Sequence, residues 1–346
     1  MGGTGGTIGD LEWPPDATVY FDEYRIFSAD CATDEDCAMA LGYYHAFDRF
    51  VQMDIRRRFS TGRLADILLP GIAAGFVDDF ADLRALFSTR DGRPAEEFLY
   101  EQSSPKTKAL LDAYAVGVNQ WIADVQNGDN DATFPREFTH ALLTYGPESI
   151  PAWRPQDSVA AVLALIETLT NDESAQVAAG NARELIDDDD KFSDLWSRRP
   201  LEESAILPLD WQPPAPPADA ASAKALERTA SDHPRLRDRL NVAPVLQRLH
   251  AKLERTLDLR NLILGPGDRP DEIGSNNWVV GPSLTTAGNA LLSNDPHLGM
   301  TQPATWYLAH IDATTNGNGE IHAAGATFAG ACPGSSLART RASLGA

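Results

Sequence analysis

The spacing of apolar residues along this chain changes from helical to strand-like near residue 275. Before it, apolar residues recur every three or four positions, as they do between Leu110 and Val125, and this spacing predicts amphipathic helices. After it, short apolar runs such as Trp278–Val280 alternate with turn residues, which predicts strands. Helices followed by antiparallel strands predict an α+β layered fold.

Capping and turn residues locate several helix and strand ends. Thr33 and Asp36 resemble a capping box and predict a helix over about 34–60. Ser104-Pro105 at one end and Gly128 at the other predict a second helix. Further expected elements are a third helix after Ser158, a strand or hairpin at 19–21 and 24–27, and strands at about 304–312 and 320–328 joined by the hairpin signal Asn316–Gly319.

The composition limits the classes of partner. With 43% hydrophobic residues and a net charge of −21, the chain is globular and acidic, so we expect neither nucleic acid nor an anionic membrane surface as a partner. No apolar run is long enough for a membrane span, and the first residues lack the basic and apolar regions of a signal peptide. Cys31 and Cys37 either pair in an oxidising compartment or pack as two thiols.

A serine at the start of the strand-like region stands out chemically. Ser275 follows Gly274 and opens the run Ser-Asn-Asn-Trp, with no local base and no Gly-x-Ser-x-Gly elbow. If the Gly274–Ser275 bond is cut, the freed α-amine, with an ordinary pKa of about 7.7–8.0, can serve as the general base for its own hydroxyl. The alternative is a surface turn that precedes a strand.

Two segments of the chain resemble the penicillin acylases of the N-terminal nucleophile hydrolase superfamily. The first runs from Gly42 to Ile67 and contains Asp48-Arg49, and the second runs from Gly274 to about Gly330 and contains Asn294-Asp-Pro-His-Leu. Tyr145-Gly-Pro and the segment 153–158 match more weakly. The resemblance, over roughly 17–330, implies an αββα four-layer sandwich with Ser275 at the end of a central strand, and hydrolysis of an N-acyl amide bond.

The resemblance also implies roles for a few residues. Ser275 would be the nucleophile, and Gly274 would precede the cut bond because glycine tolerates strained backbone geometry. His297 would hydrogen-bond the α-amine, directly or through water, with an ordinary histidine in a polar turn as the alternative, and Asn277 would orient the new terminus. No cofactor is required, but some family members bind calcium, for which Glu173 is the candidate ligand.

Other charged and polar residues have a structural interpretation. We expect Arg57, Arg58 and Arg63 to pair with the nearby acids Asp48, Asp54 and Asp66 and to fix their helix against the β subunit. His310 and His322 are expected to be ordinary strand residues.

The domain organisation follows from composition and from the resemblance. Residues 1–16 are expected to be disordered, 17–211 to be α-subunit-like and mainly helical, 212–274 to be a linker or spacer, and 275–330 to begin the β subunit. An ordinary interdomain linker with one helix is the alternative for the spacer. Processing would yield an α/β heterodimer from one precursor. By resemblance the protein would be periplasmic or secreted, and its substrate a small N-acyl compound such as a β-lactam or an acyl-homoserine lactone.

The resemblance ends abruptly after Gly330. Permitted codons for residues 331–346, read from their third base, give Leu-Pro-Gly-Val-Val and later Ala-Trp-Gly, which is the expected family sequence. We therefore predict that 331–346 is a frameshifted tail. The oxyanion-hole donors of the family lie further along, so we expect the chain as given to be inactive, and a noncatalytic truncated remnant or binding module is the alternative function.

Overall fold

The computed structural model describes residues 7–8, 11–12, 15–68, 70–73, 81, 84–139, 143–169, 274–298 and 302–332, with six further positions between 182 and 192. The chain divides into two units, residues 1–170 with 256–346 and residues 171–255, and every helix and strand named below lies in the first. None of the helices described is both long and apolar enough to cross a membrane. The predicted spacer lies outside the described residues, except for Gly274 at its end.

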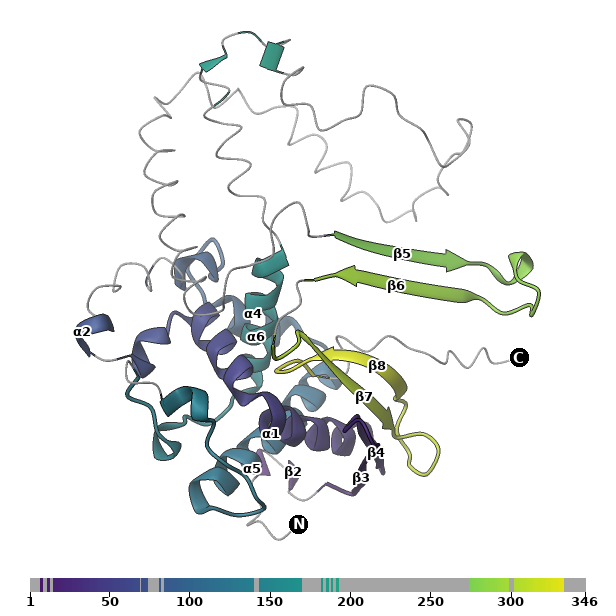
Figure 1. Ribbon diagram of the computed structural model, residues 1–346, viewed down its shortest axis with the longest axis horizontal. Coiled ribbons are helices and arrows are strands. Elements are labelled where there is room, and N and C mark those ends of the chain that lie inside the picture. Colours follow the sequence, from purple (N-terminus) through teal and green to yellow (C-terminus); the bar gives the residue numbers. More distant parts are fainter. Residues whose placement is uncertain are drawn as a thin grey trace. The chain divides into compact units, whose positions relative to one another are not determined.

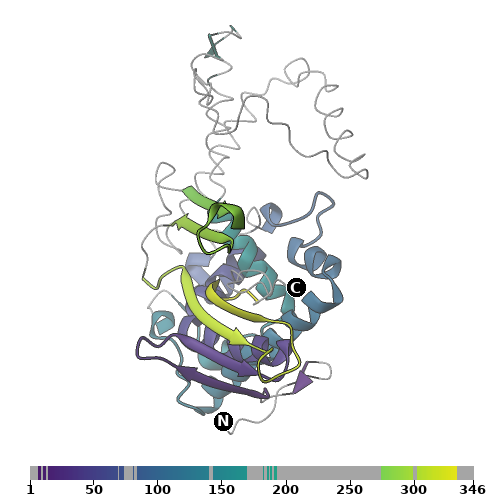
Figure 2. The ribbon, with the colours of Figure 1, turned by 90° about the vertical axis from the view of Figure 1, so that its right-hand side faces the viewer.

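Four strands form one mixed sheet in the order β3-β4-β7-β8. They span Ala17–Phe21, Phe27–Cys31, Trp306–Asp312 and His322–Phe328 respectively. The outer pairs, β3–β4 and β7–β8, are antiparallel, and the central pair β4–β7 is parallel. In Figure 2 the purple strands before residue 32 lie beside the yellow strands after residue 305. The α+β prediction is confirmed, and the parallel pair is an addition that local pattern did not indicate.

Two long helices carry most of the buried core (Figure 1). Helix α1 (Asp34–Thr61) begins at Thr33, whose hydroxyl accepts from the Asp36 N–H, and ends at Gly62. Helix α5 (Pro105–Asn127) begins at Ser104 and ends at Gly128 in the left-handed region. Both predicted helices are therefore confirmed, together with their caps.

The two helices approach each other closely at a pair of glycines. A Cβ on Gly42 would lie 2.3 Å from the Tyr114 carbonyl oxygen, and one on Gly117 would lie 1.9 Å from the Met39 carbonyl oxygen. No side chain fits at those distances, so glycine at both positions lets the backbones of α1 and α5 touch. Trp121 then packs against Phe50, with ring centroids 4.6 Å apart.

Two boundaries differ from the sequence prediction. The segment 22–26 is a turn, because the Asp22 carboxylate accepts the N–H groups of Tyr24 and Ile26, so the second strand begins at Phe27. Helix α6 (Pro155–Leu169) begins four residues before the start predicted after Ser158. There the Asp157 carboxylate accepts the Arg154 N–H at 3.0 Å, and Pro155 suits a first helical turn.

A disulfide joins the sheet to α1. Cys31, the last residue of β4, is bonded to Cys37 in the first turns of the helix, which settles the alternative left open by the sequence. The predicted hairpin at Asn316–Gly319 is also present, since it connects the antiparallel strands β7 and β8. Its turn is held at α1, where Asp34 accepts the N–H groups of Glu320 and Ile321.

A second, two-stranded sheet contains the predicted nucleophile. Strands β5 (Gly274–Val280) and β6 (Leu291–His297) form an antiparallel hairpin. The remaining elements are β1 (Thr7–Ile8) paired with β2 (Leu11–Glu12), helices α2 (Pro70–Ala73) and α4 (Ala95–Gln102), and 3-10 turns at Leu64–Ile67, Arg136–Thr139, Pro147–Ser149 and Pro282–Leu284.

Candidate active site

The register of the β5–β6 hairpin brings the two sequence motifs of the predicted site together. Gly274 is the Cα partner of His297, and Ser275 is the Cα partner of Pro296. Asn277 lies opposite Asn294, two positions further along the same ladder. Pro296 and His297 thus lie opposite the Gly274–Ser275 peptide bond on the neighbouring strand.

The hairpin exposes apolar side chains on both of its faces. Val279 and Leu292 are cross-strand partners and share one face, whereas Val280 and Leu291 pair one step along and share the other. Trp278 is 60% exposed, and Val279 is 74% exposed. Side chains of this kind are normally covered in a folded protein, so this hairpin carries surface suited to packing on each side.

The metal prediction is not tested by the part of the chain that the structure describes. Glu173, the candidate calcium ligand, lies outside the described residues. Among those residues, no group of three or more His, Cys, Asp or Glu side chains could hold a metal ion.

A buried ionic cluster occupies the second half of α1. The Asp54 carboxylate accepts from Arg57 Nε at 2.6 Å and from Arg58 Nε at 2.8 Å, and all three side chains are buried. Burial alone would raise the pKa of Asp54, but the two guanidinium charges outweigh it and lower that pKa. Arg57 also binds Asp157 at 3.1 Å, and Arg58 and Arg63 both reach Asp66. Two of the three predicted partners of the arginines, Asp54 and Asp66, are thus confirmed.

The pairing predicted for Asp48 is wrong. Asp48 accepts the hydroxyl of Tyr307 at 2.8 Å and lies 3.8 Å from Arg25. It precedes Arg57 by nine residues, beyond the one-turn reach of helix side-chain pairs, and α1 is kinked between them at Arg49.

Arg57 also binds a different segment from the β-subunit segment that the sequence predicts. Arg57 donates to the carbonyls of Pro151 and Ala152 just before α6, so it fixes α1 to a segment that precedes Ser275. Contacts with the segments after Ser275 come instead from other side chains of α1. Arg49 and Gln52 donate to the Ala304 carbonyl, Gln52 also donates to the Pro303 carbonyl, and Arg56 donates to the Ala329 carbonyl.

The sequence did not single out a buried histidine at the centre of the core. His45 is fully buried, and its Nδ1 lies 2.8 Å from the Tyr114 hydroxyl. Its ring stands edge-on to Tyr307, with centroids 4.6 Å apart. Burial and the charge of Arg49 lower the pKa of His45 to about 3. The only signal in the sequence is that His45 falls among the apolar positions of α1.

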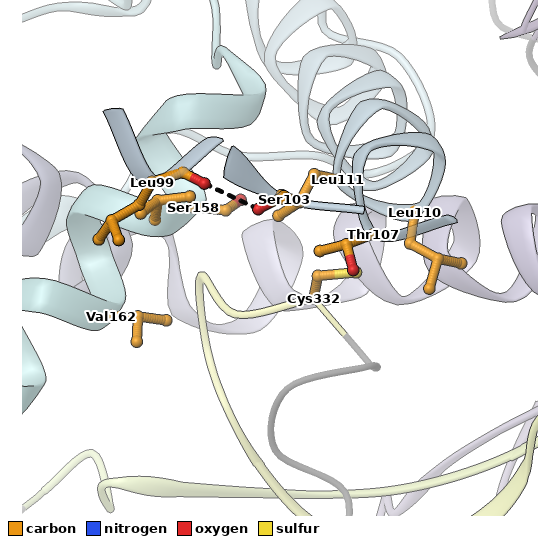
Figure 3. Close-up of a pocket in the computed structure, with 9 residues that line it drawn as sticks. Leu99, Ser103, Thr107, Leu110, Leu111, Ser158, Val162 and Cys332 are labelled. Carbon is orange, nitrogen blue, oxygen red and sulfur yellow. Dashed lines mark hydrogen bonds between the residues drawn. The ribbon is translucent and has the colours of Figure 1, made fainter. Parts of the chain in front are cut away.

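An apolar cavity of about 200 Å³ lies among α4, α5, α6 and Cys332 (Figure 3). Its hydroxyl groups are already hydrogen bonded: Ser103 donates to the Leu99 carbonyl at 2.9 Å, and Ser158 accepts the Trp153 indole N–H at 3.0 Å. The walls therefore present mainly carbon atoms, and the cavity suits a small apolar group.

Comparison with known proteins places the chain in a family. Residues 16–342 match the penicillin amidase family, which is nearly the whole chain. The chain belongs to the penicillin amidase family. It is 27% identical over 298 residues to acyl-homoserine lactone acylase QuiP of Pseudomonas aeruginosa and 28% identical over 282 residues to penicillin acylase 2 proenzyme of a Pseudomonas species.

This penicillin amidase family member matches only part of those relatives. The alignments cover 86% and 80% of this chain, but only 29% of each relative. Among solved structures, a thermostable penicillin G acylase from Alcaligenes faecalis is similar, with a TM-score of 0.45 and 18% identity over 56% of this chain and 98% of that chain.

Proposed function

We propose that this family member is an amide hydrolase whose nucleophile is Ser275, exposed by cleavage of the Gly274–Ser275 bond. The observation that carries the proposal is the β5–β6 register, which sets Gly274 opposite His297 and Ser275 opposite Pro296. Cleavage would place the new α-amine at the end of β5, beside the strand that ends in His297.

Maturation would begin with an N→O acyl shift. The Ser275 hydroxyl attacks the Gly274 carbonyl carbon, the C–N bond breaks, and the amide nitrogen takes up the hydroxyl proton to become an amine. Water then opens the resulting ester, which leaves a carboxylate on Gly274 and restores the Ser275 hydroxyl. The precursor is inactive because its amide nitrogen cannot act as a base.

Turnover would use the freed amine as the general base. It accepts the Ser275 proton while the hydroxyl attacks the acyl carbonyl, and the proton passes to the departing amine product. Water, activated by the same amine, hydrolyses the acyl-enzyme. His297 would hydrogen-bond the amine directly or through water and keep it aimed, and Asn277 would orient the terminus.

The substrate class we propose is a small N-acyl compound. Two of the relatives are named for acyl-homoserine lactone and for penicillin, and both classes of molecule carry an acylated amine. A periplasmic or secreted location is supported by the Cys31–Cys37 disulfide, because disulfides persist in oxidising compartments.

The proposal includes a heterodimer of the two products. Strand β4 precedes the cut bond and β7 follows it, yet they pair in parallel from Phe27 with Ala309 to Asp30 with Asp312. The contacts of α1 with Pro303, Ala304 and Ala329 also cross the cut. We therefore expect the products to remain together under native conditions and to separate in denaturant.

The test is intact-mass analysis of the purified protein, expressed from the gene in both possible reading frames beyond Gly330. We expect a fragment ending at Gly274 and a fragment beginning at Ser275 in at least one of them. Ser275→Ala should abolish cleavage and hydrolysis of an N-acyl probe, whereas Ser293→Ala, on the neighbouring strand β6, should preserve both. Cleavage that survives Ser275→Ala, or a single uncut chain in both frames, would refute the proposal.

A further inference from the structure

We infer that His45 and Tyr114 are positioning residues for the chain that leaves β8, and that His45 is held as the neutral tautomer with its proton on Nε2. The pair links the interior of α1 and α5 to Gly330, the residue two places after β8. The bearing of this pair on catalysis rests on the proposed function, because the resemblance places the oxyanion-hole donors further along the chain from Gly330.

The hydrogen-bond directions follow from the donors available. The Gly330 N–H donates to the Tyr114 oxygen at 3.1 Å, so Tyr114 keeps its own hydroxyl proton for its second partner. That partner is His45 Nδ1 at 2.8 Å, which must then accept. A neutral imidazole carries one proton, and here it belongs on Nε2.

The burial of both groups supports these protonation states. Burial raises the pKa of the Tyr114 hydroxyl well above its ordinary value, so Tyr114 remains a donor. Burial, with a smaller contribution from Arg49, lowers the pKa of His45. Protonating Nδ1 would leave the Tyr114 proton facing another N–H, in a site that is closed to water.

An aromatic ring packs against the same imidazole. His45 Nε2 is buried and has no hydrogen-bond partner among the described residues. The Tyr307 ring stands at 84° to the imidazole, with centroids 4.6 Å apart, a geometry that suits an N–H group over a π face. Tyr307 is itself fixed because its hydroxyl donates to Asp48 at 2.8 Å.

Gly330 is a position at which a hydrogen bond can set the direction of the chain. Its φ is +99°, in the region that favours glycine, and a Cβ there would lie 3.0 Å from the Ala161 Cβ. The preceding carbonyl, of Ala329, accepts from Arg56 at 3.4 Å. The peptide group between Ala329 and Gly330 is thus held on both sides, by α1 and by α5, which sets the direction in which the chain leaves the sheet.

The test uses uncut Ser275→Ala protein, so that it does not depend on cleavage or turnover. Histidine labelled with ¹⁵N reports the tautomer, and His45→Asn identifies the His45 signals among the seven histidines. We expect one histidine with a proton on Nε2 and no change between pH 5 and pH 8. A proton on Nδ1, or titration in that range, would overturn the inference.

Hydrogen exchange at the Gly330 amide tests positioning with matched variants. Tyr114→Phe removes the acceptor and should lower protection at least tenfold. The amide oxygen of Asn can replace Nδ1, whereas Gln places its amide near Nε2, so His45→Asn should retain protection that His45→Gln loses. A role in packing alone predicts the reverse order because Gln fills more of the site. Equal protection in the Asn and Gln variants would also contradict positioning.

Discussion

Lowering the pH from 7 to 5 should destabilise the unit that contains α1 through His45. In the folded protein, burial and the charge of Arg49 lower the pKa of His45 to about 3, whereas an unfolded histidine has a pKa of about 6.5. Between these values the unfolded chain binds more protons than the folded one. The stability contribution is therefore fully present above pH 6.5 and is lost progressively as the pH falls toward 3.

The expected size can be calculated from the two pKa values. Proton uptake by His45 on unfolding lowers the free energy of unfolding by about 0.2 kcal/mol at pH 7 and by about 2 kcal/mol at pH 5. The loss across this interval is therefore about 2 kcal/mol, which corresponds to roughly a thirtyfold change in the unfolding equilibrium. The neighbouring hydroxyls of Tyr114 and Tyr307 stay protonated across this range, because burial raises the pKa of both.

Urea denaturation at pH 5 and pH 7 measures the effect in the native protein and in His45→Asn. The other histidines and the carboxylates titrate in both proteins, so their contributions cancel in the comparison. The native protein should lose about 2 kcal/mol more than the variant when the pH falls. The same pH dependence in both proteins would show that His45 is not held neutral by burial and would refute this account.

Three further predictions concern the ionic cluster, the helix crossing and the thiol. Asp54→Asn should lower the free energy of unfolding by about 3–5 kcal/mol, because it leaves two buried guanidinium groups with weaker partners. Asp66→Asn, at a side chain that is 46% exposed, should lower it by under about 1 kcal/mol. Similar losses for the two variants in urea denaturation would contradict this assignment. Gly117→Ala should destabilise the protein by roughly 1–3 kcal/mol, because the added Cβ meets the backbone of α1. Gly128→Ala, in open space with φ +75°, should destabilise it by about 1 kcal/mol. An unchanged melting temperature in the Gly117 variant would refute the close contact between α1 and α5. Unfolded but unreduced protein should show one reactive thiol per chain, from the buried Cys332, and three reactive thiols would contradict the disulfide.

The helix ends are predictable from sequence because capping is local. Thr33 with Asp36, and Ser104 with Gly128, lie within a few residues of the groups that they satisfy. The strand pair β7–β8 is predictable for the same reason, since its turn is short and rich in glycine and asparagine. The start of α6 is harder to predict, because the carboxylate that caps it, that of Asp157, follows the first helical residue and accepts the N–H of the earlier Arg154.

Pairings between distant segments are not accessible in this way. Nothing near Phe27 indicates that it will pair with Ala309, because a parallel ladder has no turn to mark it. His45 is missed for a related reason: its neighbours Tyr114 and Tyr307, and Gly330 which binds Tyr114, come from three other parts of the chain. The Ser275 and His297 motifs could be related in advance only through the family resemblance, and the hairpin register supports that relation at the level of the backbone.

The first of the two segments that resemble the family, which includes most of α1, makes structural contacts. Along α1, Gly42 allows the backbone of α5 to approach closely. His45 and Asp48 both contact Tyr307. Asp54 binds the buried Arg57 and Arg58. Each of these residues makes close contacts within the core, so a substitution would disturb packing whatever the substrate. A match in such a segment therefore identifies the fold and the family, but it says little about the acyl group of the substrate. Under the proposed function, substrate choice would depend on residues close to Ser275, and none of the α1 contacts described here involves that residue.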